Sequence, residues 1–405
     1  MNKVVYLDNN ATTRVAPEVL EEILPFFSER YGNPSSMHSF GGEVGKEIKK
    51  AREKVAAILN CSPEEIIFTA CGTESDNTAI FSALRSFPEK RHLITTKVEH
   101  PAILSLCKYL EKKLGYEVTY LGVNAQGELD LEELKASIRP DTAIISVMWA
   151  NNETGVVFPI AEIAEIAKEK GVLFHTDAVQ AVGKEEIDLS KLPVDMLSLS
   201  GHKLHAPKGV GALFVRKKTP FQPFMIGGHQ ERGRRAGTEN TTGIIGLGKA
   251  CELAANNFEE ERTRVKALRD KLEQGLLKIP YTRLNGHKEK RLPNTCNVSF
   301  GYVEGEAILL LLNELGICAS SGSACTSGSL EPSHVLRAMG VPFNYAHGSI
   351  RFSLSRYNSE EEIELVLKEM PRIIEKLRSI SPFSPEEMEK ELKQGKDNWG
   401  QCACH

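Results

Sequence analysis

Short apolar runs alternate with helical segments across residues 62–215, and this alternation constrains the fold more than any other feature of the chain. The expected strands are residues 65–69, 92–96, 142–149, 172–175 and 196–199, and the expected helices are residues 74–84, 101–113 and 160–168. Strands that alternate with helices along the chain are typical of a mostly parallel sheet covered by helices on both faces. The sequence therefore predicts an α/β protein with a large sheet domain.

The pattern changes after about Thr241 and indicates a smaller α+β domain. Its expected elements are a long helical stretch over 242–277, a strand at 296–300, a helix at 304–315, a Ser/Gly-rich loop at 320–329, a strand at 349–354, and a last amphipathic helix near 363–377 with a possible kink at Pro371. The first residues precede the alternating pattern and are assigned to this domain too. We expect a large domain at 16–258, a small one at 1–15 and 259–395, and a mobile polar tail at 396–405.

Composition narrows the functional classes. A chain of 405 residues is too long for one small core. Its net charge of -4 argues against nucleic-acid binding, which is marked by a basic excess. No apolar run reaches the roughly 18 residues of a membrane span, and no signal peptide is visible, so we expect a cytoplasmic protein without a membrane partner. Nine irregularly spaced cysteines favour thiols over a disulfide framework.

One lysine stands where a parallel sheet binds ligands. Lys203 follows the apolar run 196–199, and a lysine amine there can form a Schiff base. Most lysines simply lie on the surface, so Lys203 alone has little weight. Asp177 ends the neighbouring strand and could pair with a protonated pyridine nitrogen, although a helix N-cap is the ordinary alternative. Gln180 could hydrogen-bond the phenolic oxygen of such a ring.

A turn between a strand and a helix offers a phosphate site. Backbone amides at Gly72 and Thr73, with the Thr73 hydroxyl, would open the helix that follows residues 65–69. Ser200 and His202 could add contacts. Together with Lys203, these positions predict pyridoxal 5'-phosphate (PLP) as the cofactor.

Many short motifs in order make the sequence resemble a known family. They lie at residues 7–13, 32–36, 72–77, 99–102, 151–155, 175–180 (His-Thr-Asp-Ala-Val-Gln), 200–203 (Ser-Gly-His-Lys), 235–240, 321–325 (Ser-Gly-Ser-Ala-Cys) and 348–353. On these motifs, which span nearly the whole chain, it resembles the cysteine desulfurases of the NifS/IscS type, in the class V aminotransferase superfamily. The resemblance implies the aspartate aminotransferase-like fold of PLP enzymes, fold type I.

The resemblance assigns roles to the cofactor residues. Lys203 is similar to the Schiff-base lysine, Asp177 to the pyridinium partner, and Gln180 to the residue facing the ring oxygen. His100 is similar to the imidazole stacked on the ring, a candidate proton carrier, although a histidine that only starts a helix is the alternative. The implied phosphate ligands are Gly72, Thr73, Ser200 and His202. Thr238 is similar to a residue that reaches the neighbouring subunit's phosphate, which implies a homodimer.

Arg351 indicates the kind of substrate, and Cys325 indicates a residue that can carry sulfur. An arginine fork matches a carboxylate, so Arg351 is the expected clamp for an amino acid, unless it forms a structural ion pair. Asn152 is expected to contact the same carboxylate or the cofactor. Cys325 lies among small residues that cannot fill a core, so its loop should be flexible. A cysteine that carries sulfur needs such a loop, because it must reach the bound substrate and then a partner protein. The resemblance assigns the persulfide to Cys325. It leaves open that Cys325, through this persulfide, is also a shared ligand of an iron–sulfur cluster.

The implied reaction converts L-cysteine to L-alanine and passes sulfur from Cys325 to an iron–sulfur scaffold protein of the NifU/IscU kind.

The sequence gives less reason to assign a function to the other cysteines. Cys61, Cys107, Cys251 and Cys296 fall in periodic or apolar segments and are expected to be structural, whereas Cys71 and Cys318 flank the motifs. The tail residues Cys402, Cys404 and His405 could bind a metal or accept sulfur, but an unstructured end is the simpler interpretation.

Three other functions stay open. A selenocysteine lyase also uses a cysteine, and another class V aminotransferase does not need one. A non-enzymatic sulfur-trafficking protein would not need Lys203, Asp177 and Arg351 together. The turn at Gly72 lacks the G-x-G-x-x-G pattern, so a dinucleotide-dependent oxidoreductase has no support.

Overall fold

The computed structural model describes residues 4–321 and 332–381. Cys325, the centre of the expected small-residue loop, and the expected tail at 396–405 lie outside the described residues. Among the described helices, none combines the length and the apolar character that a bilayer span requires.

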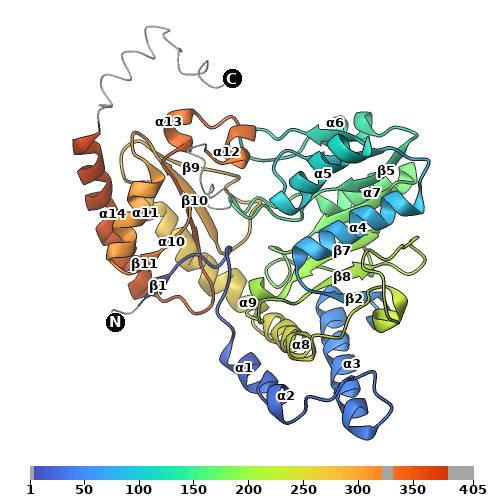
Figure 1. The fold of residues 1–405 in the computed structure, drawn as a ribbon. Helices are drawn as coiled ribbons and strands as arrows, with labels where there is room; N and C mark the ends of the chain where they lie inside the picture. The colour runs from blue at the N-terminus through green and yellow to red at the C-terminus, as the bar shows by residue number, and fades with distance from the viewer. Residues whose placement is uncertain (1–3, 322–331, 382–405) are drawn as a thin grey trace.

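A seven-stranded sheet forms the centre of the larger part (Figure 1). Its order is β2 (Ile66–Thr69), β8 (Gly211–Val215), β7 (Met196–Ser200), β6 (Leu173–Asp177), β5 (Thr142–Ser146), β3 (His92–Thr96) and β4 (Glu117–Leu121). β8 runs antiparallel to both of its neighbours, and the other adjacent pairs are parallel. The predicted α/β fold with a mostly parallel sheet is confirmed.

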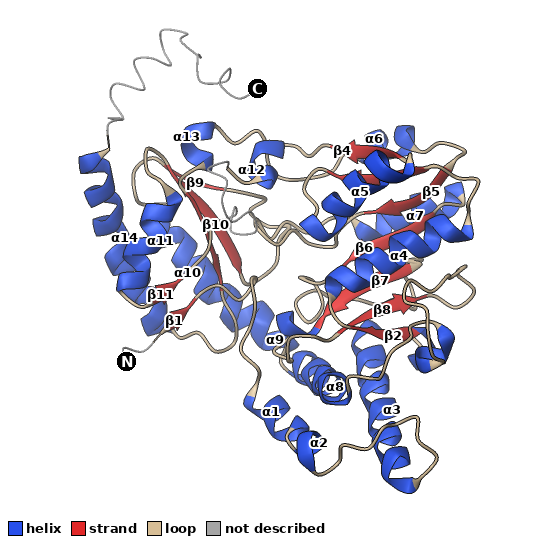
Figure 2. Cartoon of the chain, in the orientation of Figure 1, coloured by secondary structure: helices blue, strands red, loops and turns tan. Residues whose placement is uncertain are grey.

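Both faces of this sheet are buried, because alternate side chains of each strand enter different cores. Ile67 packs with α4 (Gly72–Ser86) and α5 (Pro101–Leu114) on one face. Ile66 and Phe68 pack on the other face with α3 (Ser39–Leu59), α7 (Ile160–Lys170) and α8 (Thr241–Asn256). Figure 2 shows helices on either side of the strands. This two-sided burial explains the continuous apolar runs of the strands.

A second body contains a separate antiparallel sheet, β12 (Ser349–Ser353), β10 (Thr295–Phe300) and β9 (Thr282–Leu284), in that order. β1 (Val5–Tyr6) pairs in parallel with β11 (Ile317–Cys318), so the N-terminus lies beside elements near the other end of the chain (Figure 1). α10 (Lys266–Leu276), α11 (Gly305–Glu314) and α14 (Glu360–Ile380) complete its core. The domain boundaries stay predictions.

The long helix expected over residues 242–277 is wrong as a single element. α8 ends at Asn256, and α9 (Phe258–Glu260) and a π-helical turn, η4 (Glu261–Val265), precede α10. Asn257 donates from Nδ2 to the Leu253 carbonyl at 2.7 Å, a local bond that competes with the helical one. α14, in contrast, is one helix that includes Pro371.

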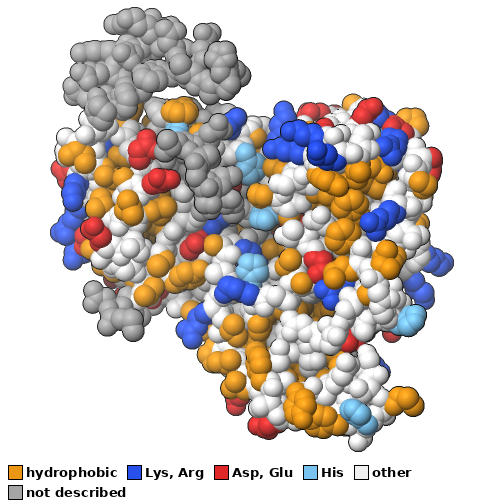
Figure 3. Space-filling view, in the orientation of Figure 1, with side chains coloured by type: hydrophobic (Ala, Val, Ile, Leu, Met, Phe, Trp, Pro, Cys, Tyr) orange, Lys and Arg blue, Asp and Glu red, His pale blue; other side chains and the backbone are white. Residues whose placement is uncertain are grey.

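The remaining elements are short. They are α1 (Pro17–Ile23), α2 (Pro25–Ser28), α6 (Leu131–Ser137), α12 (His334–Ala338), α13 (Phe343–Ala346), η1 (Pro63–Glu65), η2 (Gly201–Lys203) and η3 (Gln230–Gly233). The segment from α1 to the start of α3 carries exposed apolar side chains, and Figure 3 shows hydrophobic surface at the lower end of the molecule, where Figure 1 places these helices. The exposed side chains are Leu20, Leu24, Phe27, Tyr31, Met37 and Phe40.

Candidate active site

The carboxyl ends of β2, β3, β5, β6 and β7 meet at one edge of the large sheet, because these strands run the same way. A pocket of about 380 Å³ lies at this edge. Ten of the residues selected from the sequence line it, namely Gly72, Thr73, His100, Asn152, Asp177, Gln180, Ser200, His202, Lys203 and Arg351. The structure thus brings together residues that the sequence separates by up to 279 positions.

Lys203 ends the turn η2 that follows β7. Its Nζ donates to the carbonyls of Asn10 at 2.6 Å and of Ala11 at 2.7 Å. The amine is therefore directed at the N-terminal segment, where Asn10 and Ala11 line the pocket. Asp177 ends β6 and accepts from the Val179 amide at 2.9 Å. The chain continues from Asp177 into turns, so the helix N-cap alternative for this carboxylate is wrong.

Burial sets the charge states around Lys203. It raises the pKa of Asp177 to about 6, against the opposing effect of the Lys203 cation. It lowers the pKa of His100 to about 4, with a smaller contribution from Lys203. His100 also caps α5, since Nδ1 accepts from the Ala102 amide at 3.1 Å. The helix-start role and the place in the pocket therefore belong to the same neutral imidazole.

The expected phosphate turn opens α4 with Gly72 and Thr73 as its first residues. A Cβ on Gly72 would lie 2.8 Å from Val179 Cγ2, so only glycine fits this close approach. Ser200 Oγ is buried without a hydrogen-bond partner among the described residues. His202 shares a hydrogen bond of 3.1 Å with Thr12 Oγ1, and burial lowers its pKa to about 4.

Gln180 and Asn152 are held by backbone contacts. Gln180 donates from Nε2 to the Asn10 carbonyl at 3.0 Å, and its Oε1 has no partner among the described residues. The Asn152 carbonyl accepts from Asn10 Nδ2 at 3.1 Å and from Arg351 Nη1 at 3.0 Å. Asn10 therefore links three of the selected positions.

Arg351 lies on β12 and is 6% exposed. Its Nη2 forms an ion pair of 2.8 Å with Asp8 Oδ1, and its Nε has no partner among the described residues. The ion pair considered as the alternative for Arg351 is therefore present, in the same pocket that a substrate carboxylate would enter.

The sequence interpretation missed the contribution of residues 8–11. Asp8, Asn10 and Ala11 line the pocket, as does Asp76 on α4. The sequence does contain a signal for these residues, because they lie in the motifs at 7–13 and 72–77. The motifs alone assign them no role, since neither motif reveals which distant residue it will contact.

Thr238 does not line the pocket and is exposed. Cys325 lies outside the described residues, and so does its proposed role as an iron–sulfur ligand. Ser320 and Ser321, which precede it, do line the pocket. Cys402, Cys404 and His405 are also outside. Over residues 4–321 and 332–381, no group of His, Cys, Asp and Glu side chains is arranged to hold a metal ion.

The cysteines expected to be structural lie in the cores. Cys107, Cys251 and Cys296 are buried, and Cys61 packs against the edge of its core. Burial raises the pKa of Cys61, Cys251 and Cys296 to about 12 each, which suppresses the nucleophilic thiolate.

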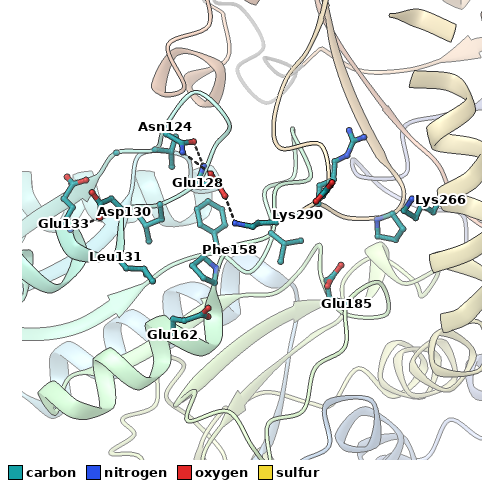
Figure 4. A pocket seen from close by; sticks show the side chains of 18 of the residues that line it. Asn124, Glu128, Asp130, Leu131, Glu133, Phe158, Glu162, Glu185, Lys266 and Lys290 are labelled. Atoms are coloured by element: carbon teal, nitrogen blue, oxygen red, sulfur yellow. Dashed lines mark hydrogen bonds and ion pairs between the residues drawn. The ribbon is translucent and has the colours of Figure 1, made fainter. Parts of the chain in front are cut away.

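A second cavity, of about 1210 Å³, lies behind the loops at 122–133 and 289–293. Figure 4 shows charged side chains around it, with Lys290 paired to Glu128 at 2.8 Å. It contains none of the residues selected from the sequence. We therefore place the active site by its chemistry in the smaller pocket.

Known proteins with this architecture identify the class. Residues 5–366 match the family model of the class-V aminotransferases. A solved NifS-like protein superposes with a TM-score of 0.88 at 44% identity, covering 93% of this chain and all of that one. Another solved structure, of SspA in complex with cysteine, superposes with a TM-score of 0.78 at 38% identity, covering 88% of this chain and all of that one. The chain belongs to the class-V aminotransferase family.

Curated relatives narrow the class. A cysteine desulfurase from Trichormus azollae is 61% identical over 385 residues, which is 95% of this chain and 96% of that protein. The cysteine desulfurase NifS of Azotobacter vinelandii is 60% identical over 381 residues, 94% of each chain. Within the family, the chain stands among the cysteine desulfurases of the NifS type, as the resemblance predicted.

Proposed function

We propose that the chain holds PLP on Lys203, converts L-cysteine to L-alanine and transfers the sulfur to Cys325. One observation carries the proposal. A lysine amine and an arginine fork line one pocket of about 380 Å³, which offers an attachment point for the cofactor and a clamp for an amino-acid carboxylate.

The polar groups of the pocket fit PLP. Ser200 Oγ and Gln180 Oε1 are buried without a partner among the described residues, and such groups require a ligand or water. Ser200 adjoins the helix start at Gly72 and Thr73, where backbone amides favour a phosphate. Asp177 offers a carboxylate to a ring nitrogen. PLP would satisfy both ends of the pocket.

When bound, PLP supplies an electron sink for the pair released at the substrate Cα. The residues of the chain bind and move the remaining groups. Arg351 and Asn152 hold the substrate carboxylate. Lys203 Nζ, in the same pocket, would accept the proton released at the substrate Cα. His100, neutral because burial lowers its pKa to about 4, is available to accept or return a proton in the same pocket.

The sulfur step falls to Cys325. Its thiolate attacks the substrate sulfur, so an S–S bond forms while the S–Cβ bond breaks. The electron pair of that bond stays on Cβ, which takes a proton and becomes the methyl group of alanine. The cysteine sulfur remains on Cys325 as a persulfide. No external oxidant is needed, because the substrate carbon is reduced as the two sulfurs are oxidised.

The active unit in this proposal is a homodimer. The exposed apolar side chains between α1 and the start of α3 form a surface that a second copy can cover. Thr238 is exposed and is not among the residues that line the pocket of its own subunit, in agreement with a role at the partner subunit's phosphate.

The sulfur acceptor in this proposal is an iron–sulfur scaffold protein of the NifU/IscU kind in the cytoplasm. The Cys325 persulfide would bind the nascent cluster's iron only during transfer, so the iron is cargo.

Incubation of the purified chain with PLP, L-cysteine and a thiol reductant tests the reaction. We expect alanine and sulfide in equal amounts. Alanine without sulfide, or pyruvate in place of alanine, would contradict the proposal. Parallel reactions with L-selenocysteine separate a desulfurase from a selenocysteine lyase.

A further inference from the structure

Asp76, on α4, is a buried carboxyl group that the proposed mechanism does not use. It is 1% exposed and lines the active-site pocket together with Asp177. Its Oδ1 has no hydrogen-bond partner within residues 4–321 and 332–381. A buried, ionised carboxylate in this state would be costly, so its protonation state requires an explanation.

A polar network contacts Asp76 on the face of β6 from which Asp177 also projects. His175 and Asp177 are two residues apart on this strand, so both side chains leave the same face of the sheet. His175 bonds Ser146 Oγ through Nδ1 and Ser198 Oγ through Nε2, each at 2.9 Å. Asp76 Oδ1 lies 3.6 Å from His175 Nε2, and the nearby Ser198 acts to lower the pKa of the Asp76 carboxyl.

Within the described residues, no cation is among the groups that act most strongly on Asp76. Complete burial lowers the pKa of His175 to about 3, so the imidazole nearest to Asp76 is neutral. The other titratable groups that act on Asp76 are Asp177, Glu99 and Cys71, and each would repel a second negative charge. Burial first, and Asp177 second, raise the pKa of Asp76 well above its ordinary value.

Asp177 has the support that Asp76 lacks. It accepts the Val179 amide at 2.9 Å, and the Lys203 cation lowers its pKa. Two buried carboxyls that repel each other cannot both ionise without a large penalty. Asp177, which has the amide hydrogen bond and the nearby cation, keeps the negative charge, and Asp76 keeps the proton.

We propose that Asp76 is held as a neutral acid and acts as a positioning residue that confines the single negative charge of the pair to Asp177. The charge then sits at the carboxylate that faces the pocket, and the proton sits on the carboxyl beside His175 and Ser198. The link to a ring nitrogen rests on the proposed function, whereas the protonation state does not.

Infrared difference spectra of the purified, cofactor-loaded chain at pH 8 test this assignment. The wild-type minus Asp76→Asn spectrum should contain the carbonyl stretch of one neutral carboxylic acid. The wild-type minus Asp130→Asn spectrum, in which an exposed helix cap is changed, should not contain that band. The proposal is overturned if the band is missing from the first spectrum or appears in the second.

The visible absorbance of the bound cofactor gives a second readout. Asparagine is neutral like the protonated acid, so Asp76→Asn should leave the pH midpoint of this absorbance unchanged. A shifted midpoint would mean that Asp76 carries charge, and would refute the proposal. Asp130→Asn, at an exposed helix cap, is the matched control and should reproduce both wild-type results.

A third variant covers the case in which Asp76→Asn does not fold. Ser198→Ala keeps the Asp76 carboxyl and removes the neighbouring hydroxyl that acts on it, so it should move the frequency of the same acid band. An unchanged band would show that the acid is another residue. Failure of the proposed reaction would appear separately, as a lack of alanine and sulfide, and would leave the infrared assignment intact.

Discussion

The guanidinium of Arg351 lies 2.8 Å from the carboxylate of Asp8, although 343 positions separate the two residues. Asp8 holds one nitrogen of the fork, the Asn152 carbonyl holds another, and Nε has no partner within the described ranges. The fork is therefore oriented before a substrate carboxylate arrives, and its charge is partly balanced while the pocket waits for one.

This orientation predicts a specific loss for Arg351→Lys. Lysine keeps the charge but not the planar pair of donors, so the substrate carboxylate loses a charge-assisted hydrogen bond. We expect the KM for L-cysteine to rise by roughly 10- to 100-fold. Asp8→Asn, which retains the arginine, should change KM much less. An unaltered KM in Arg351→Lys would show that the carboxylate binds elsewhere.

Lys203→Ala should remove the covalent attachment of the cofactor. The purified variant should lack the visible absorbance that the wild type acquires with PLP, and should form no alanine. Lys208→Ala, which changes an exposed lysine five positions away, is the control and should keep both properties. Wild-type absorbance in Lys203→Ala would reject this lysine as the attachment point.

Cys325→Ala should separate cofactor binding from sulfur transfer. The variant retains every described residue of the pocket, so its absorbance with PLP should equal that of the wild type. Sulfide production with a reductant should fall to the level measured without protein. Cys318→Ala, seven positions earlier on β11, is the matched control and should remain active. Full activity of Cys325→Ala would eliminate the persulfide assignment.

Glu153 makes stability depend on pH near neutrality. Burial raises its pKa from 4.5 to about 7, while Ser333 and Arg351 act in the opposite direction. The folded state therefore holds a proton that the unfolded state has lost, and stability falls as pH rises from about 4.5 to 7. Relative to Glu153→Gln, the wild type should lose about 1.4 kcal/mol per pH unit in this window.

Unfolding by urea at several pH values measures this difference. Above pH 7 the two curves should become parallel, since both states are then ionised. Glu162→Gln, at an exposed glutamate on α7, should follow the wild type throughout. Parallel curves for Glu153→Gln below pH 7 would show that Glu153 is ionised in the folded protein.

Phe27→Asp should disrupt the proposed dimer. Phe27 is 64% exposed at α2, and a charge there would oppose the burial of the surrounding apolar surface. We expect a monomer by sedimentation velocity and weaker PLP retention, because Thr238 would no longer reach the other subunit. Leu310→Asp changes a residue that is 68% exposed on α11 and should remain dimeric. A dimeric Phe27→Asp protein would place the interface on another face.

The large sheet and most of the pocket could be predicted because they follow local patterns. Alternating apolar runs marked the strands, and the ends of parallel strands share one edge, which brings Asp177 and Lys203 together. The direction of β8 could not be predicted, because strand orientation depends on its neighbours. The break at Asn257 arises from one side-chain bond that helical periodicity does not reveal.

Contacts between residues that are far apart in the sequence could not be predicted either. Asp8 was part of a recognised motif, yet its partner Arg351 depends on how β1 and β12 are brought together. Asp76 likewise appears as an ordinary polar residue on an amphipathic helix. Its significance arises from burial beside His175 and Ser198, which are contributed by two different strands.

The contact between Asp8 and Arg351 also sets a time at which the site can exist. During synthesis, the sheet strands and Lys203 leave the ribosome well before residue 351 does, and domains tend to fold in the order in which they emerge. The large sheet can therefore be complete while the substrate clamp is still missing. A nascent or prematurely terminated chain could capture the cofactor without gaining the arginine that selects amino acids. Competence for catalysis is thus delayed until nearly the whole chain has been translated.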